Sequence, residues 1–210
     1  MATSDLVDRN LELKPFLGIK VEDEGKDDVL DILNDVARSL IEDYLDRLVV
    51  SRGAITEFHT VWGAVSEIFM TQYPVIGITT IHEDEARVFG AASLLTENTD
   101  YIVNKPFGKV IRIDSNLQST WLTGWRAIKC VYTAGFANTA GVDATIKHAA
   151  LRTVALMYGE LERREIGYSS ISDAAGNVSR LVPGGLNQDV KRALYAHRRM
   201  EQNPTGETDV

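Results

Sequence analysis

Apolar positions divide the chain into helical ends and a strand-rich middle. Residues 27–46 carry the clearest helical pattern, with apolar side chains recurring three or four positions apart on two adjacent rows. These rows are Val29, Leu33, Val36, Leu40 and Tyr44, and beside them Leu30, Ala37, Ile41 and Leu45. A shorter apolar pattern, which Gly18 ends, predicts another helix over residues 5–17.

Between residues 48 and 134 the pattern changes to short apolar or alternating runs, rich in β-branched and aromatic residues. The expected strands span residues 48–61, 67–70, 76–81, 101–104, 109–113 and 127–134. Breaks rich in proline, glycine and acidic residues separate them. Sequential short strands with short turns favour an antiparallel meander or a small sandwich over alternating strand–helix units.

A second long helix is predicted over residues 144–161, directly after the last strand and a glycine turn at Gly135. Asp143 is placed to cap it or to complement the positive end of its dipole. The helix is apolar around so much of its circumference that it needs cover on more than one side. We expect a neighbouring subunit to supply one of these covers.

The C-terminal part has a different character. Residues 162–186 form an extended arm rich in serine, glycine and alanine, and Asn187 then opens a short basic amphipathic helix over residues 187–200. This helix either docks into a groove of another protein or folds back on its own domain. Residues 201–210 are predicted to be a disordered tail. The predicted domains are therefore a core of residues 1–161 and an arm of residues 162–210, within an α+β fold.

Charge narrows the class of function. The net charge is −8 and the sequence pI about 5.0, which argues against a sequence-independent DNA binder or a membrane-surface binder. Residues 22–46 alone hold ten acids against two bases. This run is either a solvated helix face or a wall that repels a polyanion. Its spacing does not match a calcium-binding loop.

Cysteine usage and the first residues bear on the compartment. Cys130 is the single cysteine and lies on the predicted inward face of a strand, so we expect a buried, reduced side chain and synthesis inside the cell. The first residues have an early acid and no apolar run, so we expect no signal peptide. No stretch has the length and apolarity of a membrane span.

We find no catalytic, cofactor-binding or metal-ligating constellation. The sequence has no glycine-rich phosphate loop, no Gly-x-Ser-x-Gly elbow and no His-Glu-x-x-His pattern. The histidines His59, His82, His148 and His197 fall in unrelated elements. Two alternatives to a structural role stay open: a nucleic-acid-binding module that uses the basic residues between 163 and 199, and a small soluble enzyme with an unrecognised site.

Several segments, in their order along the chain, resemble the head-to-tail connector family of tailed bacteriophages, also called adaptor or head-completion proteins. These segments are LKPFLGI, DVLDILNDVARSLIEDYLDR, YPVIGITTI, the pair YIV and GKVIRI, IKCVYTAGF followed by VDATIKHAALRTVALMY, and VPGGLNQDVKRALYAHRR. Together they cover most of residues 6–161 and part of the C-terminal region. The arm of residues 162–186 and the loop of residues 83–99 depart from the shorter members of the family.

The resemblance implies a non-enzymatic ring, typically of twelve subunits, in the virion at the head–tail junction. Such a ring binds the portal protein on one side and a stopper or tail-completion protein on the other, and DNA passes through it without specific binding. It implies synthesis in the host cytoplasm, no cofactor and no membrane.

The resemblance also suggests roles for three sets of residues. The expected portal-docking set is Val190, Lys191, Arg192, Leu194, His197, Arg198 and Arg199. The expected channel-facing acids are Asp27, Asp28, Asp31, Asp35, Glu42 and Asp43. The expected inter-subunit packing residues are Leu151, Val154 and Tyr158.

Overall fold

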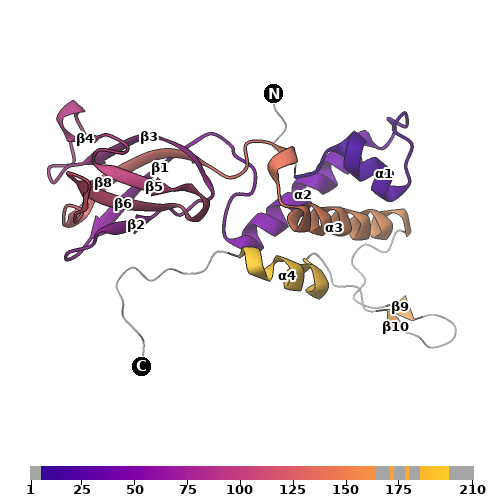
Figure 1. Ribbon diagram of the computed structural model, residues 1–210. Helices are drawn as coiled ribbons and strands as arrows, with labels where there is room; N and C mark the ends of the chain where they lie inside the picture. The colour runs from indigo at the N-terminus through magenta and orange to yellow at the C-terminus, as the bar shows by residue number, and fades with distance from the viewer. Residues whose placement is uncertain (1–5, 164–170, 173–177, 180–184, 199–210) are drawn as a thin grey trace. The chain divides into compact units, whose positions relative to one another are not determined.

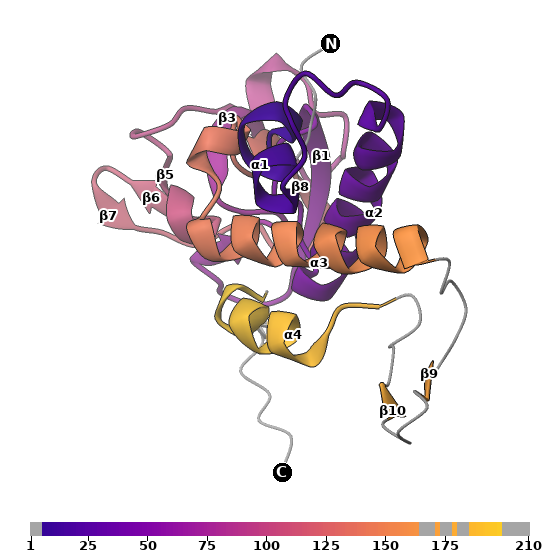
Figure 2. The same cartoon turned by 90° about the vertical axis from the view of Figure 1, so that its right-hand side faces the viewer.

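The computed structural model describes residues 6–163, 171–172, 178–179 and 185–198. The fold is α+β, as predicted, with helices and antiparallel sheets. The chain divides into two compact units. Among the described residues, the helical unit comprises residues 6–46 and those described between 138 and 198, and the sheet unit comprises Arg47–Ala137. Figure 1 and Figure 2 together label the helices and strands.

Two long helices and two short ones build the helical unit. The long helices are α2 (Asp27–Leu45) and α3 (Ala144–Arg163), and the short ones are α1 (Lys14–Leu17) and α4 (Gln188–Leu194). A π-helical turn, Arg9–Leu13, precedes α1, and 3₁₀ turns occupy Thr139–Gly141 and Tyr195–His197. Helix α3 packs between α2 and α4, and Figure 2 shows α4 alongside it.

The prediction for residues 27–46 is confirmed nearly to the residue. The row Leu30, Ala37, Ile41 and Leu45 is fully buried, whereas Val29 and Val36 of the other row lie on the surface. The first predicted helix is four residues shorter at its start than expected. Asp8 is extended and caps the helical turn, its carboxylate accepting hydrogen bonds from the backbone N–H groups of Asn10 and Leu11. Gly18 ends it in the left-handed conformation, as predicted.

The sheet unit contains two antiparallel sheets. The first has the order β1 (Ala54–Val61), β8 (Gly124–Ala134), β3 (Val75–Glu83) and β4 (Leu94–Leu95). In the second, β6 (Lys109–Asp114) lies between β2 (Glu67–Phe69) and β5 (Tyr101–Asn104), and also pairs with β7 (Leu117–Gln118). Because β8 lies between β1 and β3, the first sheet is not a sequential meander. Residues 48–53 are not a strand, contrary to expectation, and β4 and β7 were not predicted.

The two sheets contribute to a common core. Ile128, Cys130, Tyr132 and Ala134 of β8 are buried in it, which confirms the predicted inward face of that strand. The second sheet adds Ile68, Tyr101 and Val110, and Trp121 is buried among them. In the arm, β9 (Ile171–Ser172) and β10 (Val178–Ser179) form a short antiparallel ladder.

Candidate functional site

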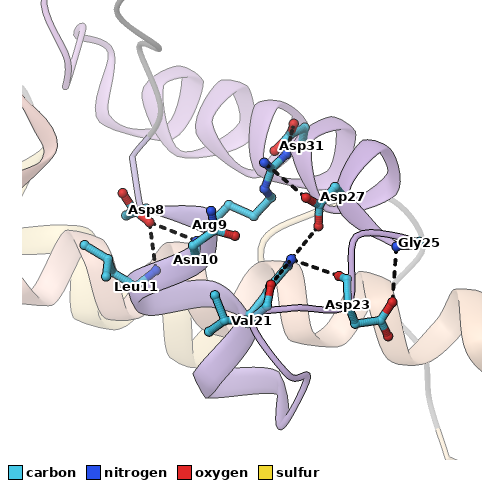
Figure 3. A network of polar contacts seen from close by, with 10 residues as sticks. Asp8, Arg9, Asn10, Leu11, Val21, Asp23, Gly25, Asp27 and Asp31 are labelled. Atoms are coloured by element: carbon cyan, nitrogen blue, oxygen red, sulfur yellow. Dashed lines mark hydrogen bonds and ion pairs between the residues drawn. The ribbon is translucent and has the colours of Figure 1, made fainter.

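The acidic start of α2 is tied to the preceding loop by a buried lysine. The side chain of Lys14 is only 1% exposed, and its ammonium group lies 2.6 Å from a carboxylate oxygen of Asp27. The same group donates hydrogen bonds to the backbone carbonyls of Val21 and Asp23, at 3.0 and 2.9 Å. Figure 3 shows these contacts converging on one nitrogen. A buried ammonium needs such a set of acceptors, and here it fixes the loop that leads into α2.

Arg9 compensates two of the predicted channel acids. Its guanidinium lies 3.2 Å from the Asp27 carboxylate and 2.5 Å from that of Asp31 (Figure 3). Asp27 therefore contacts two cations, Arg9 from the turn before α1 and Lys14 from α1 itself. Neither Asp27 nor Asp31 carries an uncompensated charge.

The remaining predicted channel acids differ among themselves. Asp35 pairs with Arg38 one turn along the helix, at 2.9 Å. Glu42 is buried in the helical unit, so its expected exposure to a channel is corrected: it lies beside the buried row of α2. Asp28 and Asp43 are exposed and have no ion pair in the part of the chain that the structure describes. These residues do not form a uniform acidic wall.

The exposed side of α2 is partly apolar, which the sequence pattern alone did not separate from the core side. Val29, Ile32 and Val36 are 36%, 62% and 43% exposed, and Asp28 and Asp35 accompany them. The positions i, i+1, i+4, i+7 and i+8 lie on one side of a helix over about two turns. We call these five residues the α2 outer face.

The predicted docking helix is anchored in the helical unit. Val190 and Leu194 are 1% and 0% exposed, so these two residues are corrected from a docking surface to internal packing. The Tyr44 hydroxyl donates to the backbone carbonyl of Lys191 at 3.0 Å. The apolar side of this helix therefore packs on its own unit, as in the second of the two alternatives given for it.

The outward residues of this region retain surface positions. Arg192 and Arg198 are exposed, and the Arg198 guanidinium lies 5.8 Å from the ring centre of Tyr44. His197 is half-buried, and its Nε2 lies 3.7 Å from the Asp143 carboxylate. The pKa of Asp143 is lowered, first by the hydrogen bond from the backbone N–H of Thr145. Arg199 lies outside the described residues.

The predicted inter-subunit residues of α3 also divide. Val154 is fully buried within the helical unit, where α3 packs against α2 and α4, and is therefore corrected to a core residue. Leu151 is half-buried. Tyr158 is half-buried, and its hydroxyl lies 2.5 Å from the ammonium of Lys26, which also pairs with Glu162 at 2.6 Å. The hydrogen bond that the Lys26 ammonium donates to the Glu162 carboxylate lowers the pKa of Glu162. Leu156, which is not among the predicted inter-subunit residues, is 45% exposed.

A polar cluster in the sheet unit serves packing. The Glu57 carboxylate accepts hydrogen bonds from the Tyr132 hydroxyl at 2.6 Å and from the Thr71 hydroxyl at 2.9 Å. It also accepts from the Thr71 backbone N–H, and His59 lies 3.3 Å away. Burial lowers the pKa of His59, and burial raises the pKa values of Tyr132 and Cys130. A carboxylate so occupied, beside a protonated thiol, satisfies its own hydrogen bonds and offers no free nucleophile.

Within residues 6–163, 171–172, 178–179 and 185–198, no three His, Cys, Asp or Glu side chains gather in a way that could bind a metal ion. In the same residues, none of the helices combines the length and apolarity required to span a bilayer.

The chain is similar to known proteins in its fold and not in its sequence. No protein-family model and no curated protein matches the sequence. Among solved structures, a chain of the neck of a native gene transfer agent particle, computed with C12 symmetry, matches at TM-score 0.57 and 15% identity, over 95% of this chain and 94% of that one. The chain has the fold of these neck proteins.

Two further structures agree. The neck of an empty gene transfer agent particle, computed with C6 symmetry, matches at TM-score 0.56 and 17% identity, over 95% of both chains. A chain of the native gene transfer agent virion matches at TM-score 0.58 and 17% identity, over 95% of this chain and 97% of that one. This likeness agrees with the resemblance to head-to-tail connectors that the sequence motifs indicate.

Proposed function

We propose that this chain is a structural subunit of the neck of a tailed, phage-like particle. In this proposal it forms a ring that joins the portal vertex of the capsid to a stopper or tail-completion protein, surrounds the path of the DNA and catalyses no reaction. The observation that carries the proposal is the likeness of fold to neck chains over 95% of this chain and at least 94% of theirs. A match of that extent includes both units, not one common domain.

The number of subunits in the proposed ring is twelve. The matching necks were computed with C12 and C6 symmetry, and rings of identical subunits joined head to tail have cyclic symmetry. Within that ring, the proposed inter-subunit contribution of α3 narrows to its partly or fully exposed residues Leu151, Leu156 and Tyr158. The core residue Val154 is not part of it.

Portal docking is proposed for the outward side of the last helical turns. Arg192, Tyr195 and Arg198 are exposed there, and Lys191 and His197 are partly so. The buried Val190 and Leu194 hold this segment against the helical unit, so that the exposed cations are presented on an anchored element. Channel exposure stays a prediction for Asp28, Asp31, Asp35 and Asp43, with Asp28 and Asp43 as the acids that no described cation pairs with.

The experiment that tests the proposal is native mass spectrometry of the full chain, alone and mixed with the portal and stopper proteins of the same particle. We expect a twelve-subunit ring on the portal and a ternary complex with the stopper. Cryo-electron microscopy of assembled particles then locates the subunit. A chain that stays monomeric with the portal, or that is found away from the head–tail junction, contradicts the proposal.

Charge variants sharpen the docking part. Arg192→Glu combined with Arg198→Glu is expected to weaken attachment to the portal while the ring contacts and the thermal unfolding temperature stay unchanged. Lys105→Glu, an exposed cation of the sheet unit, is the matched control. Unchanged portal attachment of the double variant counts against docking through this segment.

A further inference from the structure

The outer face of the first sheet carries aromatic and cationic side chains that the proposed function leaves unexplained. We name this cluster the sheet-face patch; it consists of Phe58, Arg87, Phe89, Trp125, Arg126 and Lys129. Phe58 of β1 pairs with Lys129 of β8, which pairs in turn with His82 of β3. Since side chains alternate across a strand, Lys129 lies on the face opposite to the buried Cys130.

Aromatic rings hold the cations of this patch. The Arg126 guanidinium lies 4.2 Å from the ring centre of Phe58 and 5.6 Å from that of Trp125. Arg87 lies 5.5 Å from the Trp125 ring, and the Lys129 ammonium lies 5.6 Å from the Phe89 ring. Cation–π contacts fix the position of a charge without neutralising it. The charges are therefore oriented and still available to a partner.

Among the described residues, no carboxylate pairs with these three cations. Other cations of the same unit have acidic partners: Lys109 lies 2.6 Å from Glu67, and Arg112 lies 3.1 Å from Glu83. Arg87, Arg126 and Lys129 have no such ion pair within the described part of the chain. In a protein with a net negative charge, three neighbouring cations without an ion pair are available to bind the acidic groups of a partner.

The backbone of the patch is held in an unusual conformation. Arg87, Phe89 and Arg126 have φ values of 60°, 52° and 50°, in the left-handed region that residues with a side chain rarely adopt. The Asp84 carboxylate accepts hydrogen bonds from the backbone N–H groups of Ala86, Val88 and Phe89 and so fixes the loop. Such backbone persists only where the surroundings impose it, and it is enriched at binding sites.

The composition of the patch favours a protein partner. Trp125 of β8 is 58% exposed, and Val88, on the loop that carries Arg87 and Phe89, is 78% exposed. Exposed tryptophan and arginine around an apolar centre are typical of protein–protein interfaces. A partner that fits must bring carboxylates together with aliphatic side chains.

The α2 outer face has this chemistry. It presents Val29, Ile32 and Val36 with Asp28 and Asp35 along one side of about two helical turns. The chain segments that carry the two surfaces also differ in charge. Residues 6–46 hold twelve acids against five bases, whereas residues 47–137 hold eight of each.

We propose that the sheet-face patch of one copy binds the α2 outer face of a neighbouring copy. This proposal rests on the ring proposed above. A contact between two different surfaces of the same chain repeats head to tail, and it closes as a ring when the rotation per subunit allows. In this contact Asp28 and Asp35 meet Arg87, Arg126 and Lys129, and the aliphatic side chains of α2 cover the exposed rings. Of the acids proposed to face the channel, Asp31 and Asp43 then keep that role.

Cross-linking of isotopically mixed copies tests the contact directly. The full-length protein is prepared once with ¹⁴N and once with ¹⁵N, the two are mixed and assembled on the portal, and a zero-length carbodiimide joins lysine amines to adjacent carboxylates. We expect a linkage between Lys129 and Asp28 or Asp35 in peptide pairs of mixed isotope. Linkages of these residues only within one isotope, or their absence while other mixed-isotope linkages form, overturn the proposal.

A charge exchange tests the same pairing energetically. Arg87→Glu with Arg126→Glu, and separately Asp28→Lys with Asp35→Lys, are each expected to weaken subunit association at least ~10-fold. The chain that carries all four changes is expected to recover most of the loss, since the opposite charges then meet again. Failure of the fourfold variant to recover overturns the pairing, as does normal association of either double variant.

Controls separate this proposal from the proposed function. Lys105→Glu and Asp114→Lys change exposed charges outside both surfaces and are expected to leave association unchanged. Circular dichroism and thermal unfolding verify the fold of every variant. Rings that form normally in all variants refute this contact but leave the ring intact. Unchanged wild-type monomers in the presence of portal refute the ring itself. Patch variants that lose DNA binding and keep association identify a nucleic-acid surface instead, which also overturns the proposal.

Discussion

The helical unit gathers twelve acids in residues 6–46 and pairs several of them with nearby cations, whereas the sheet unit has equal numbers of acids and bases among residues 47–137. The start of α2 therefore depends on electrostatic contacts of Lys14 and Arg9. The sheet unit depends on an apolar core, beside which the nearly buried carboxylates of Glu57 and Glu83 are held by their own donors. The difference teaches that charge is structural in the first unit and mostly superficial in the second.

The largest expected effect comes from the first unit. Lys14→Met leaves the Asp27 carboxylate and two backbone carbonyls without their buried donor, and we expect a loss of about 3–5 kcal/mol in the free energy of unfolding. Urea unfolding measures it. The exposed Lys20→Met is the matched control. A loss below about 1 kcal/mol means that the compensation by Lys14 is dispensable, and the comparison of the two units fails.

A smaller effect is expected from the hydrogen bonds around Glu57 in the sheet unit. Tyr132→Phe removes the hydroxyl that donates to Glu57 at 2.6 Å and accepts from the Gln72 backbone N–H at 3.1 Å. We expect a loss of about 1–3 kcal/mol in the free energy of unfolding. The exposed Tyr195→Phe serves as the control in the same urea titration. If both tyrosines respond equally, the buried network has no special weight.

The helix cap in front of α1 sharpens the comparison further. Asp8→Ala removes the acceptor for the backbone N–H groups of Asn10 and Leu11, at 2.9 and 2.8 Å. We expect a loss of about 1 kcal/mol, measurable by thermal unfolding. Glu85→Ala, an exposed acid of the sheet unit, is expected to have no measurable effect. Equal losses for both would remove the distinction between structural and superficial acids.

The smallest expected effect is a change in pH dependence. Burial lowers the pKa of His59 below its ordinary value of 6.5, so the unfolded chain binds the proton more readily than the folded chain. Stability contributed by the neutral side chain is complete above that value and falls as the pH drops from about 6.5 towards the lower, folded pKa. His59→Gln is expected to flatten this part of the profile in unfolding measured from about pH 7 to about pH 5. An identical slope in both proteins contradicts the assignment.

The sequence was most informative where periodicity alone determines structure. Helix α2, with its buried row from Leu30 to Leu45, and the inward face of β8 follow directly from apolar spacing. The extent of α3 was predicted for the same reason. Residues 48–53 were assigned to a strand because their composition is apolar, yet Val49 and Val50 are buried without a continuous ladder.

The candidate sites were less predictable, since they depend on which residues meet. An amphipathic basic helix has the same pattern whether its apolar side docks on another protein or on its own unit, and Val190 and Leu194 do the second. The Lys14 network joins a lysine to a loop seven to nine residues away. The sheet-face patch brings together Phe58, Arg87 and Arg126, which no sequence spacing relates.

The enclosed amine of Lys14 has one more consequence. In the folded chain its nitrogen is shielded and held by three oxygen acceptors, so a water-soluble acetylating reagent should modify the exposed lysines, such as Lys20 and Lys105, long before it modifies Lys14. The time course of labelling at this one position, followed by peptide mass spectrometry, would then report how often the start of α2 opens. The same labelling rate could be compared between the free chain and a chain assembled into a particle.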